Sequence, residues 1–121
     1  MTTICYSGQI LIEDSDFTLE AQRFIVRESE ISFSMEGYDE YGQFNIEGVA
    51  VKTEANVYWA SNLILKYKQY INSDKASIKI EPYKITKKGK CEFKGSWTQY
   101  GNTWYFNAKL KPINVAIPSS V

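Results

Sequence analysis

The chain has 121 residues, in which 14 lysines and arginines balance 14 aspartates and glutamates, and it contains no histidine. This length predicts a single domain that spans residues 1–121. The absence of histidine removes the commonest general base and metal ligand, and the chain has neither a glycine-rich phosphate loop nor cysteine pairs at zinc spacing. We therefore expect a protein that is not an enzyme and has no metal or cofactor.

The first residues lack a basic stretch followed by an apolar run, and no segment reaches the length of a membrane span. We therefore expect a cytoplasmic protein that does not associate with a membrane. The two cysteines, Cys5 and Cys91, are too few for a disulfide framework. In the cytoplasm they are expected to be free thiols that pack as small apolar residues.

Alternation of apolar and polar residues predicts β-strands from the start of the chain. Residues 4–12 alternate and end at an acidic turn over residues 13–16. Residues 17–26 have mixed parity, which indicates a bulge or a strand covered on both faces. Residues 31–36 alternate cleanly and predict a strand with one apolar face.

The parity of the next strand changes along its length. A loop at residues 37–42 precedes a strand that begins at Phe44. Val49 and Val51 have the opposite parity to Phe44. A glycine bulge near Gly48 would shift the inward face in this way, so both valines are predicted to point inward.

Residues 57–67 form the next predicted strand, because their valine, tyrosine, tryptophan and isoleucine content favours a strand over a helix. In residues 76–80 apolar side chains alternate with lysine and other polar residues. Pro82 indicates an edge strand or the end of this strand, because proline cannot donate a ladder hydrogen bond. A tight turn with an available glycine is predicted at residues 86–90.

The clearest element is a hairpin formed by residues 91–98 and 104–111, whose apolar face carries Trp97 and Trp104. Turn signals every roughly ten residues predict about nine short strands. The expected fold is all-β, an antiparallel barrel or a barrel-like sandwich. The predicted core consists of Ile10, Ile12, Phe33, Phe44, Ile46, Trp59, Leu63, Leu65, Ile78, Ile80, Phe93, Trp97, Trp104, Phe106 and Leu110.

Charge is sorted along the chain. Residues 1–60 carry eleven acidic and three basic side chains, a net charge of −8, whereas residues 61–121 carry eleven lysines and three acidic side chains, a net charge of +8. In a meander, strands that are neighbours in the sequence are usually neighbours in space. We therefore expect the two halves of the chain to form two oppositely charged sides of the domain. If strands of the two halves interleaved instead, cross-strand ion pairs would cancel the field.

One segment combines acidic residues with tyrosines and is the candidate protein-binding site. Tyrosine is a good interface anchor, and carboxylates attract a basic partner. The alternative interpretation is a solvated loop without a partner. Because the loop is expected to be exposed, neutralising two of its acids should barely change stability. The predicted contacts are Glu36, Tyr38, Asp39, Glu40 and Tyr41, with Asp39 and Glu40 as the pair to neutralise, and the predicted rim charges are Glu28, Glu30 and Glu47.

The end of the chain resembles known proteins in two patterns. Gly95-Ser96-Trp97 is similar to the Gly-x-Trp signature of lipocalins, which those proteins carry on their first strand, so no ligand residues are carried over. The pattern Gly95-x-Trp97, Gly101-x-x-Trp104-x-Phe106, Leu110-x-Pro112 resembles the ending of small bacterial all-β proteins. Some of these resemble immunity proteins encoded beside secreted toxins. This resemblance implies a structural hairpin, not a set of functional residues.

We therefore expect a non-catalytic protein-binding module of the immunity type, which captures a basic toxin, for example a nuclease, on its acidic half. One alternative is a carrier of a small apolar or amphipathic ligand, in a barrel cavity of about 300 Å³ or more lined by Trp59, Trp97 and Trp104. A second alternative is a nucleic-acid-binding barrel, for which the net charge near zero is unfavourable. Its binding face would combine Lys66, Tyr67, Lys68, Gln69, Tyr70, Lys84, Lys87, Lys88 and Lys90.

Overall fold

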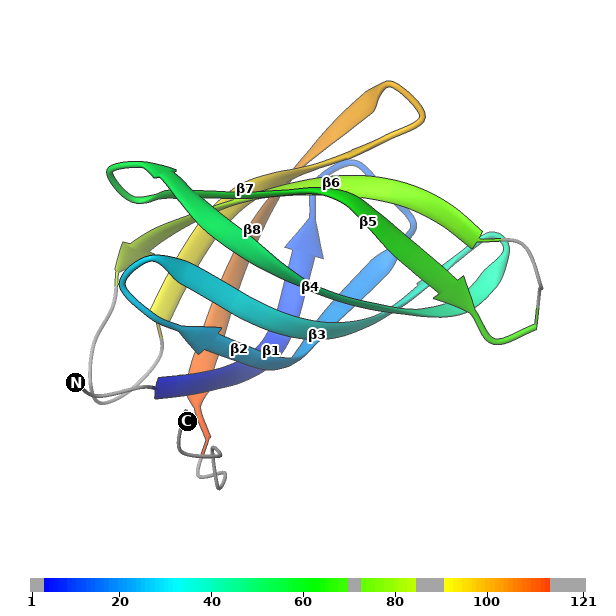
Figure 1. The fold of residues 1–121 in the computed structure, drawn as a ribbon. Helices are drawn as coiled ribbons and strands as arrows, with labels where there is room; N and C mark the ends of the chain where they lie inside the picture. The colour runs from blue at the N-terminus through cyan, green and yellow to red at the C-terminus, as the bar shows by residue number, and fades with distance from the viewer. Residues whose placement is uncertain (1–3, 70–72, 85–90, 114–121) are drawn as a thin grey trace, which may run out of the picture.

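The computed structural model describes residues 4–69, 73–84 and 91–113, which form a closed antiparallel barrel of eight strands (Figure 1). Each strand pairs with the next along the chain, and β8 pairs with β1 to close the barrel. The predicted all-β barrel is confirmed, with eight strands where about nine were expected. The strands are β1 Ile4–Ile12, β2 Thr18–Val26, β3 Glu30–Asp39, β4 Gly42–Glu54, β5 Val57–Tyr67, β6 Ser73–Lys84, β7 Cys91–Gln99 and β8 Asn102–Pro112.

The hairpin of β7 and β8 forms as its sequence pattern predicts. Trp97 pairs with Trp104, and a two-residue turn of Tyr100 and Gly101 joins the strands. Both turn residues have positive φ, 55° and 76°, as a type I′ turn requires. The twist of this turn matches that of the paired strands. The predicted turn at residues 86–90 lies outside the described residues.

Inward side chains fill the barrel interior. Along β3, buried and partly buried residues alternate without interruption from Glu30 to Gly37. An eight-stranded barrel is just wide enough for side chains to fill it. Cys5 and Cys91 are buried free thiols, as expected. The largest fully buried side chains are those of Trp97, Tyr6, Phe24, Phe44, Phe93 and Phe106.

The predicted core is correct except at one tryptophan. Trp59 is 37% exposed and lies on the outer face of β5, whereas Trp97 is fully buried. The register of β5 against β6 shifts between Ala60 and Leu63, where Asn62 has a φ of 57°. This bulge moves the inward positions from one parity to the other, so simple alternation misplaces Trp59. Ile12 and Trp104 are partly buried and pack against the core, and the other predicted core residues are buried.

The predicted shift of parity at Gly48 is wrong. β3 and β4 pair in continuous register along this segment, and Val49 and Val51 are exposed on the outer face. Gly48 lies at an inward position of β4. A methyl group at this position would overlap the side chain of Leu63. The glycine therefore makes room for a core side chain and does not form a bulge.

The strand pairing locates two other irregularities that the sequence indicated. The mixed parity of residues 17–26 reflects a register shift between Ala21 and Arg23, so the bulge interpretation is confirmed. Pro82 lies near the end of β6, beside a register shift between Pro82 and Lys84. No helix among the described residues has the length and apolar character needed to cross a membrane.

The strand order keeps the two charged halves apart. The acidic residues of the first half belong to β1–β4 and the turns that connect them, which are consecutive around the barrel. Among the described residues, the lysines of the second half belong to β5–β8, except Lys68, which directly follows β5. The halves meet at only two seams, β4–β5 and β8–β1. The prediction that they do not interleave is therefore confirmed.

Candidate binding site

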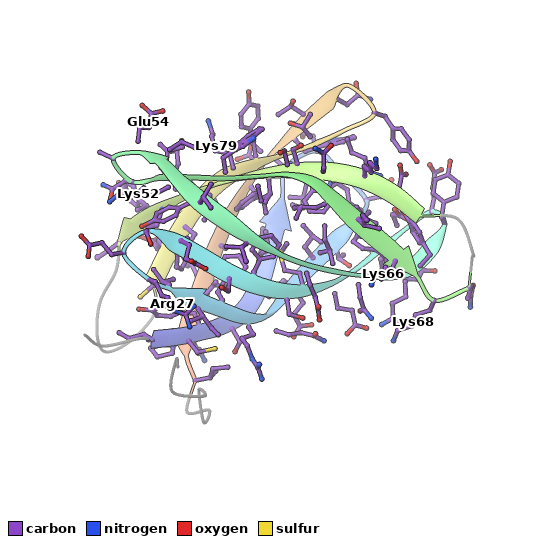
Figure 2. All side chains as sticks on the ribbon, in the orientation of Figure 1. Arg27, Lys52, Glu54, Lys66, Lys68 and Lys79 are labelled. Atoms are coloured by element: carbon purple, nitrogen blue, oxygen red, sulfur yellow. The ribbon has the colours of Figure 1, made fainter. Side chains whose placement is uncertain are left out.

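Alternate turns of an up-and-down barrel lie at the same end. The turns after β1, β3, β5 and β7 lie at one end, which we call the mouth, and the turns after β2 and β4 lie at the other, which we call the base. Figure 2 shows Lys66 and Lys68 toward the mouth, and Arg27, Lys52 and Glu54 toward the base. The mouth therefore brings together turns that are far apart in the sequence.

Four of the predicted contact residues lie together at the mouth. Tyr38 and Asp39 end β3, and Glu40 and Tyr41 form the turn to β4. Tyr38 is 61% exposed and Tyr41 is 48% exposed. Two aromatic side chains beside carboxylates thus face solvent, which is the composition of an interface anchor.

The predicted Glu36 and Glu47 point outward from β3 and β4 and, with Glu20 on β2, form what we call the acidic wall. Glu20 and Glu36 are direct cross-strand partners, an arrangement of like charges that destabilises a strand pair. Glu36 has partial compensation, because Gln22 donates a 2.7 Å hydrogen bond to it and Lys68 Nζ lies 3.6 Å from its Oε1.

A shallow groove runs over the acidic wall where it approaches the mouth. Its volume is about 520 Å³, and Glu20, Glu36 and Tyr38 line it together with Gln9, Thr18 and Gln43. The groove therefore connects the exposed Tyr38 with the two paired glutamates. Its lining residues come from β1–β4, and its two carboxylates come from β2 and β3.

The predicted rim charges Glu28 and Glu30 do not belong to this surface. They lie at the base, where Glu28 is in the β2–β3 turn and Glu30 begins β3. The backbone N–H groups of Arg27 and of Lys52 on β4 donate to the carbonyls of Glu30 and Ser29 there. Glu30 and Asp39 occupy opposite ends of β3, about 30 Å apart at about 3.3 Å per residue. The buried Tyr58 donates a 3.0 Å hydrogen bond to the backbone carbonyl of Glu28, which anchors this turn over the base.

A cup of about 390 Å³ opens at the mouth. Its wall contains six aromatic side chains, those of Phe17, Tyr38, Tyr41, Phe44, Tyr100 and Trp104. Three carboxylates, those of Asp16, Asp39 and Glu40, line the same hollow. Aromatic faces combined with carboxylates form the type of surface that attracts cations.

The aromatic rings of the cup continue into the barrel interior as one contacting series. Phe17 packs edge-on against Trp104, with 5.6 Å between ring centroids, and against Trp97 at 6.0 Å. Phe44 contacts Trp97 at 6.5 Å and Tyr67 at 5.5 Å. The floor of the cup is therefore the top of the packed core.

Hydrogen bonds hold the carboxylate of Asp39 in place. Tyr67 donates its hydroxyl to Oδ2 at 2.6 Å, and the backbone N–H of Tyr41 donates to Oδ1 at 2.8 Å. Burial raises the pKa of Tyr67 well above its usual value. The hydrogen bond to Asp39 and the negative charges of Asp39 and Asp74 raise it further. Asp39 is consequently held by two hydrogen bonds and is not the free exposed charge on which the expectation of unchanged stability rested, so we now expect the loss of its carboxylate to cost stability.

A second hydrogen-bond chain crosses the mouth from the other half of the barrel. Trp97 Nε1 donates to Gln99 Oε1 at 3.0 Å, and Gln99 Nε2 donates to Asp74 Oδ2 at 3.0 Å. The chain connects β7 with the start of β6. It orients the Gln99 side chain that also lines the cup.

The carboxylates of the cup have no basic counterpart within the described part of the chain. None of its lysine or arginine nitrogens lies within salt-bridge distance of Asp16, Asp39 or Glu40. The negative charge of Glu40, followed by desolvation and by Asp39 and Asp74, raises the pKa of Tyr41. Within the described residues, these three carboxylates therefore have no ion pair that neutralises them.

The lysine-rich segment proposed for nucleic acid is not gathered on one face. Lys66 and Lys68 lie toward the mouth, whereas Lys84 ends β6 at the base. Tyr67 is partly buried and holds Asp39, so its ring is not available for stacking on a base. Tyr70, Lys87, Lys88 and Lys90 lie outside the described residues.

Sequence reasoning missed half of the mouth. Asp16 and Tyr100 belong to turns recognised in the sequence, and Phe17 begins the strand predicted at residues 17–26, but alternation does not say which turns meet. The closure of β1 on β8 brings the first and last turns of the mouth together. Once an up-and-down barrel is assumed, counting alternate turns would have identified these residues. Within the described ranges, no three histidine, cysteine, aspartate or glutamate side chains are placed so that they could hold a metal ion.

The chain matches no protein-family model and no characterised protein. The resemblance of the C-terminal hairpin to toxin-immunity proteins therefore stays a prediction. The geometry of the mouth and the acidic wall is the basis for assigning a function.

Proposed function

We propose that this protein is a non-catalytic binding module that holds a basic protein against the mouth and the acidic wall. The observation that carries the proposal is the excess of carboxylates on consecutive strands, of which Glu36 alone has a described ion pair, beside two exposed tyrosines. Complementary charge speeds association, and buried tyrosine rings supply affinity at interfaces.

The acidic wall adds an energetic argument. Glu20 and Glu36 face each other across β2 and β3, and this repulsion lowers the stability of the free protein. A lysine or arginine of a partner placed between them would remove the repulsion and form new ion pairs. The folded protein thus carries a local cost that a basic partner relieves.

The immunity-type role fits this surface. A nuclease that holds a polyanion needs a basic surface, and an acidic inhibitor competes for that surface. We propose occlusion by Glu36, Tyr38, Glu40 and Tyr41, with Asp39 as the group that orders the turn. Glu47 and Glu20 supply flanking charge on the acidic wall. Glu28 and Glu30 are left out of the contact because they lie at the base.

The experiment first recovers a partner by pull-down from the native host and identifies the neighbouring gene. Association is then measured by stopped flow at several salt concentrations for the unmodified protein. The test variant is Glu20→Gln/Glu40→Gln, and the matched control is Glu28→Gln/Glu54→Gln, which removes the same charge at the base. We expect the test variant to associate several-fold more slowly at low salt and the control to match the unmodified protein.

Two results would contradict the proposal. An association rate of the unmodified protein that does not change with salt would show that electrostatic attraction plays no part. Equal slowing by both double variants would show that net charge matters and the location of the surface does not. A neighbouring gene unrelated to toxins, together with no basic protein recovered, would remove the support for an immunity-type role.

The carrier alternative needs a different location for its ligand. Trp59 lies outside the barrel, and Trp97 is enclosed by other core rings, so these residues do not line a cavity with Trp104. The cup at the mouth, which exceeds about 300 Å³, is the specific observation that favours a small-ligand site. Such a ligand would sit on top of the core and not within it.

A further inference from the structure

The cup combines two surfaces that recognise the same chemistry. The rings of Phe17, Tyr41 and Trp104 in its lining are apolar, and the faces of aromatic rings carry negative potential. The carboxylates of Asp16, Asp39 and Glu40 in the same lining supply negative charge. A ligand that fills the cup meets both surfaces at once.

The carboxylates of the cup have no ion pair with a described lysine or arginine, whereas three acids of the outer wall do. Glu36 has Lys68, Glu81 has Lys79 at 3.4 Å, and Glu92 has Lys109 at 3.8 Å. These three ion pairs lie on the outer face of the barrel. Within the described residues, the acids of the cup are therefore open to a cation from outside.

The cup is formed before any ligand arrives. Tyr67 and the N–H of Tyr41 hold Asp39, and Phe17 is held between Trp97 and Trp104. The N–H of Phe17 also donates to Ser15 Oγ at 3.1 Å, which orders the turn that carries Asp16. A site whose groups are already fixed loses little conformational entropy on binding.

We propose that the cup binds an organic cation, an alkylammonium or guanidinium group, between its aromatic wall and its carboxylates. An aromatic wall alone would accept a neutral apolar ligand, but three carboxylates would have to lose water without compensation. An anion would be repelled by the same groups. A cation gains from the ring faces and from the carboxylates together.

The choice of probe distinguishes two sources of the cation, a free small molecule and a side chain of a protein partner. Choline represents a free quaternary ammonium compound, and its neutral isostere is 3,3-dimethyl-1-butanol. Nα-acetyl-arginine amide represents a side chain of a protein partner, and its neutral isostere is Nα-acetyl-citrulline amide. Each probe is titrated into the protein, and binding is followed by the amide shifts of residues around the cup in NMR spectra.

We expect at least one cation to bind, with its neutral isostere weaker by about tenfold or more. Binding of choline alone assigns the site to a free small molecule, and binding of the arginine probe alone assigns it to a partner side chain. Equal binding of a cation and its isostere would overturn the proposal. The absence of shifts with both cations at millimolar concentration would also overturn it.

Variants locate the site. Trp104→Leu and Glu40→Gln should each weaken cation binding several-fold, and Glu40→Gln serves as the test if Trp104→Leu does not fold. The matched controls are Trp59→Leu on the outer face of β5 and Glu28→Gln at the base, which should bind as the unmodified protein does. Loss of binding in the controls but not in Glu40→Gln would place the site elsewhere.

This inference stands apart from the proposed protein partner. Glu20→Gln lies on the acidic wall outside the cup, so it should slow a basic protein and leave the binding of small cations unchanged. Failure of the cation titration would leave the salt-dependent association intact. Failure of the pull-down would leave the cup as a site for a free organic cation.

Discussion

Tyr67 on β5 donates its hydroxyl to Asp39 at the end of β3, with 2.6 Å between the two oxygens. The bond passes over the start of β4 and joins the lysine-rich and acid-rich halves of the barrel at the mouth. It links the packing of the aromatic floor to the conformation of the β3–β4 turn. The consequences for stability, for pH dependence and for the acidic surface can each be measured.

Removal of the carboxylate of Asp39 is expected to destabilise the protein. Asp39→Ala leaves the partly buried hydroxyl of Tyr67 and the N–H of Tyr41 without their acceptor, at a cost of about 1–3 kcal/mol in the free energy of unfolding. Glu40 is exposed in the turn, so Glu40→Ala should change it by less than about 0.5 kcal/mol. Urea denaturation followed by fluorescence compares the two variants. Equal losses would show that the hydrogen bonds of Asp39 do not hold the mouth.

The stability of the protein is expected to fall in alkaline solution. Burial raises the pKa of Tyr6, Tyr58 and Tyr67 above the ordinary value of 10. Above about pH 10 the unfolded chain loses these protons while the folded chain keeps them, so the unfolded state binds fewer protons and stability decreases as pH rises. Melting temperatures between about pH 8 and pH 11 measure the slope.

Tyr67→Phe provides the control for this pH dependence. Phenylalanine cannot ionise, so the variant should be less stable at neutral pH but lose less stability between about pH 9 and pH 11. Tyr105→Phe, at an exposed position on β8, should keep the slope of the unmodified protein. A slope that is the same in all three proteins would assign the alkaline loss to groups other than Tyr67.

Two of the three tryptophans that the sequence placed in the core, Trp97 and Trp59, should differ greatly when truncated. Trp97→Ala removes a fully buried ring that contacts Phe17 and Phe44, and it is expected to cost about 3–5 kcal/mol. Trp59→Ala acts on a ring 37% exposed on the outer face of β5, and the loss should be clearly smaller. Denaturant midpoints give both values. If Trp97→Ala does not fold, the more conservative Trp97→Phe should still destabilise more than Trp59→Ala.

Removal of one charge from the Glu20–Glu36 pair should stabilise the free protein. Glu20→Gln keeps the shape of the side chain and ends the cross-strand repulsion, which should add a few tenths of a kcal/mol at low salt. The gain should shrink as salt rises, because exposed charges are screened. Glu28→Gln at the base is the control. A stability loss in Glu20→Gln at low salt would mean that Glu36 and its neighbours already neutralise the pair.

Local alternation was enough to predict most of the strands and much of the core. The period of two depends only on each strand having one face inside the barrel, so β3 and the hairpin of β7 and β8 follow directly from their residues. Alternation failed at Trp59 because one extra residue in the bulge of β5 reverses the parity of the strand. It failed at Val49 because a glycine can either form a bulge or make room for a neighbouring side chain. Only the packing of Leu63 against Gly48 distinguishes these roles.

The sequence by itself also showed that charge is divided between the two halves of the chain, and a meander keeps such halves apart. It could not show that Glu28 and Glu30 lie at the opposite end from Asp39, because alternation describes the two faces of a strand and not its two ends. It could not show the cup, because Asp16, Asp39 and Trp104 meet only when β8 pairs with β1. That pairing joins residues about a hundred positions apart, and its free energy comes from the filled interior, so only the tertiary structure decides which turns share the mouth.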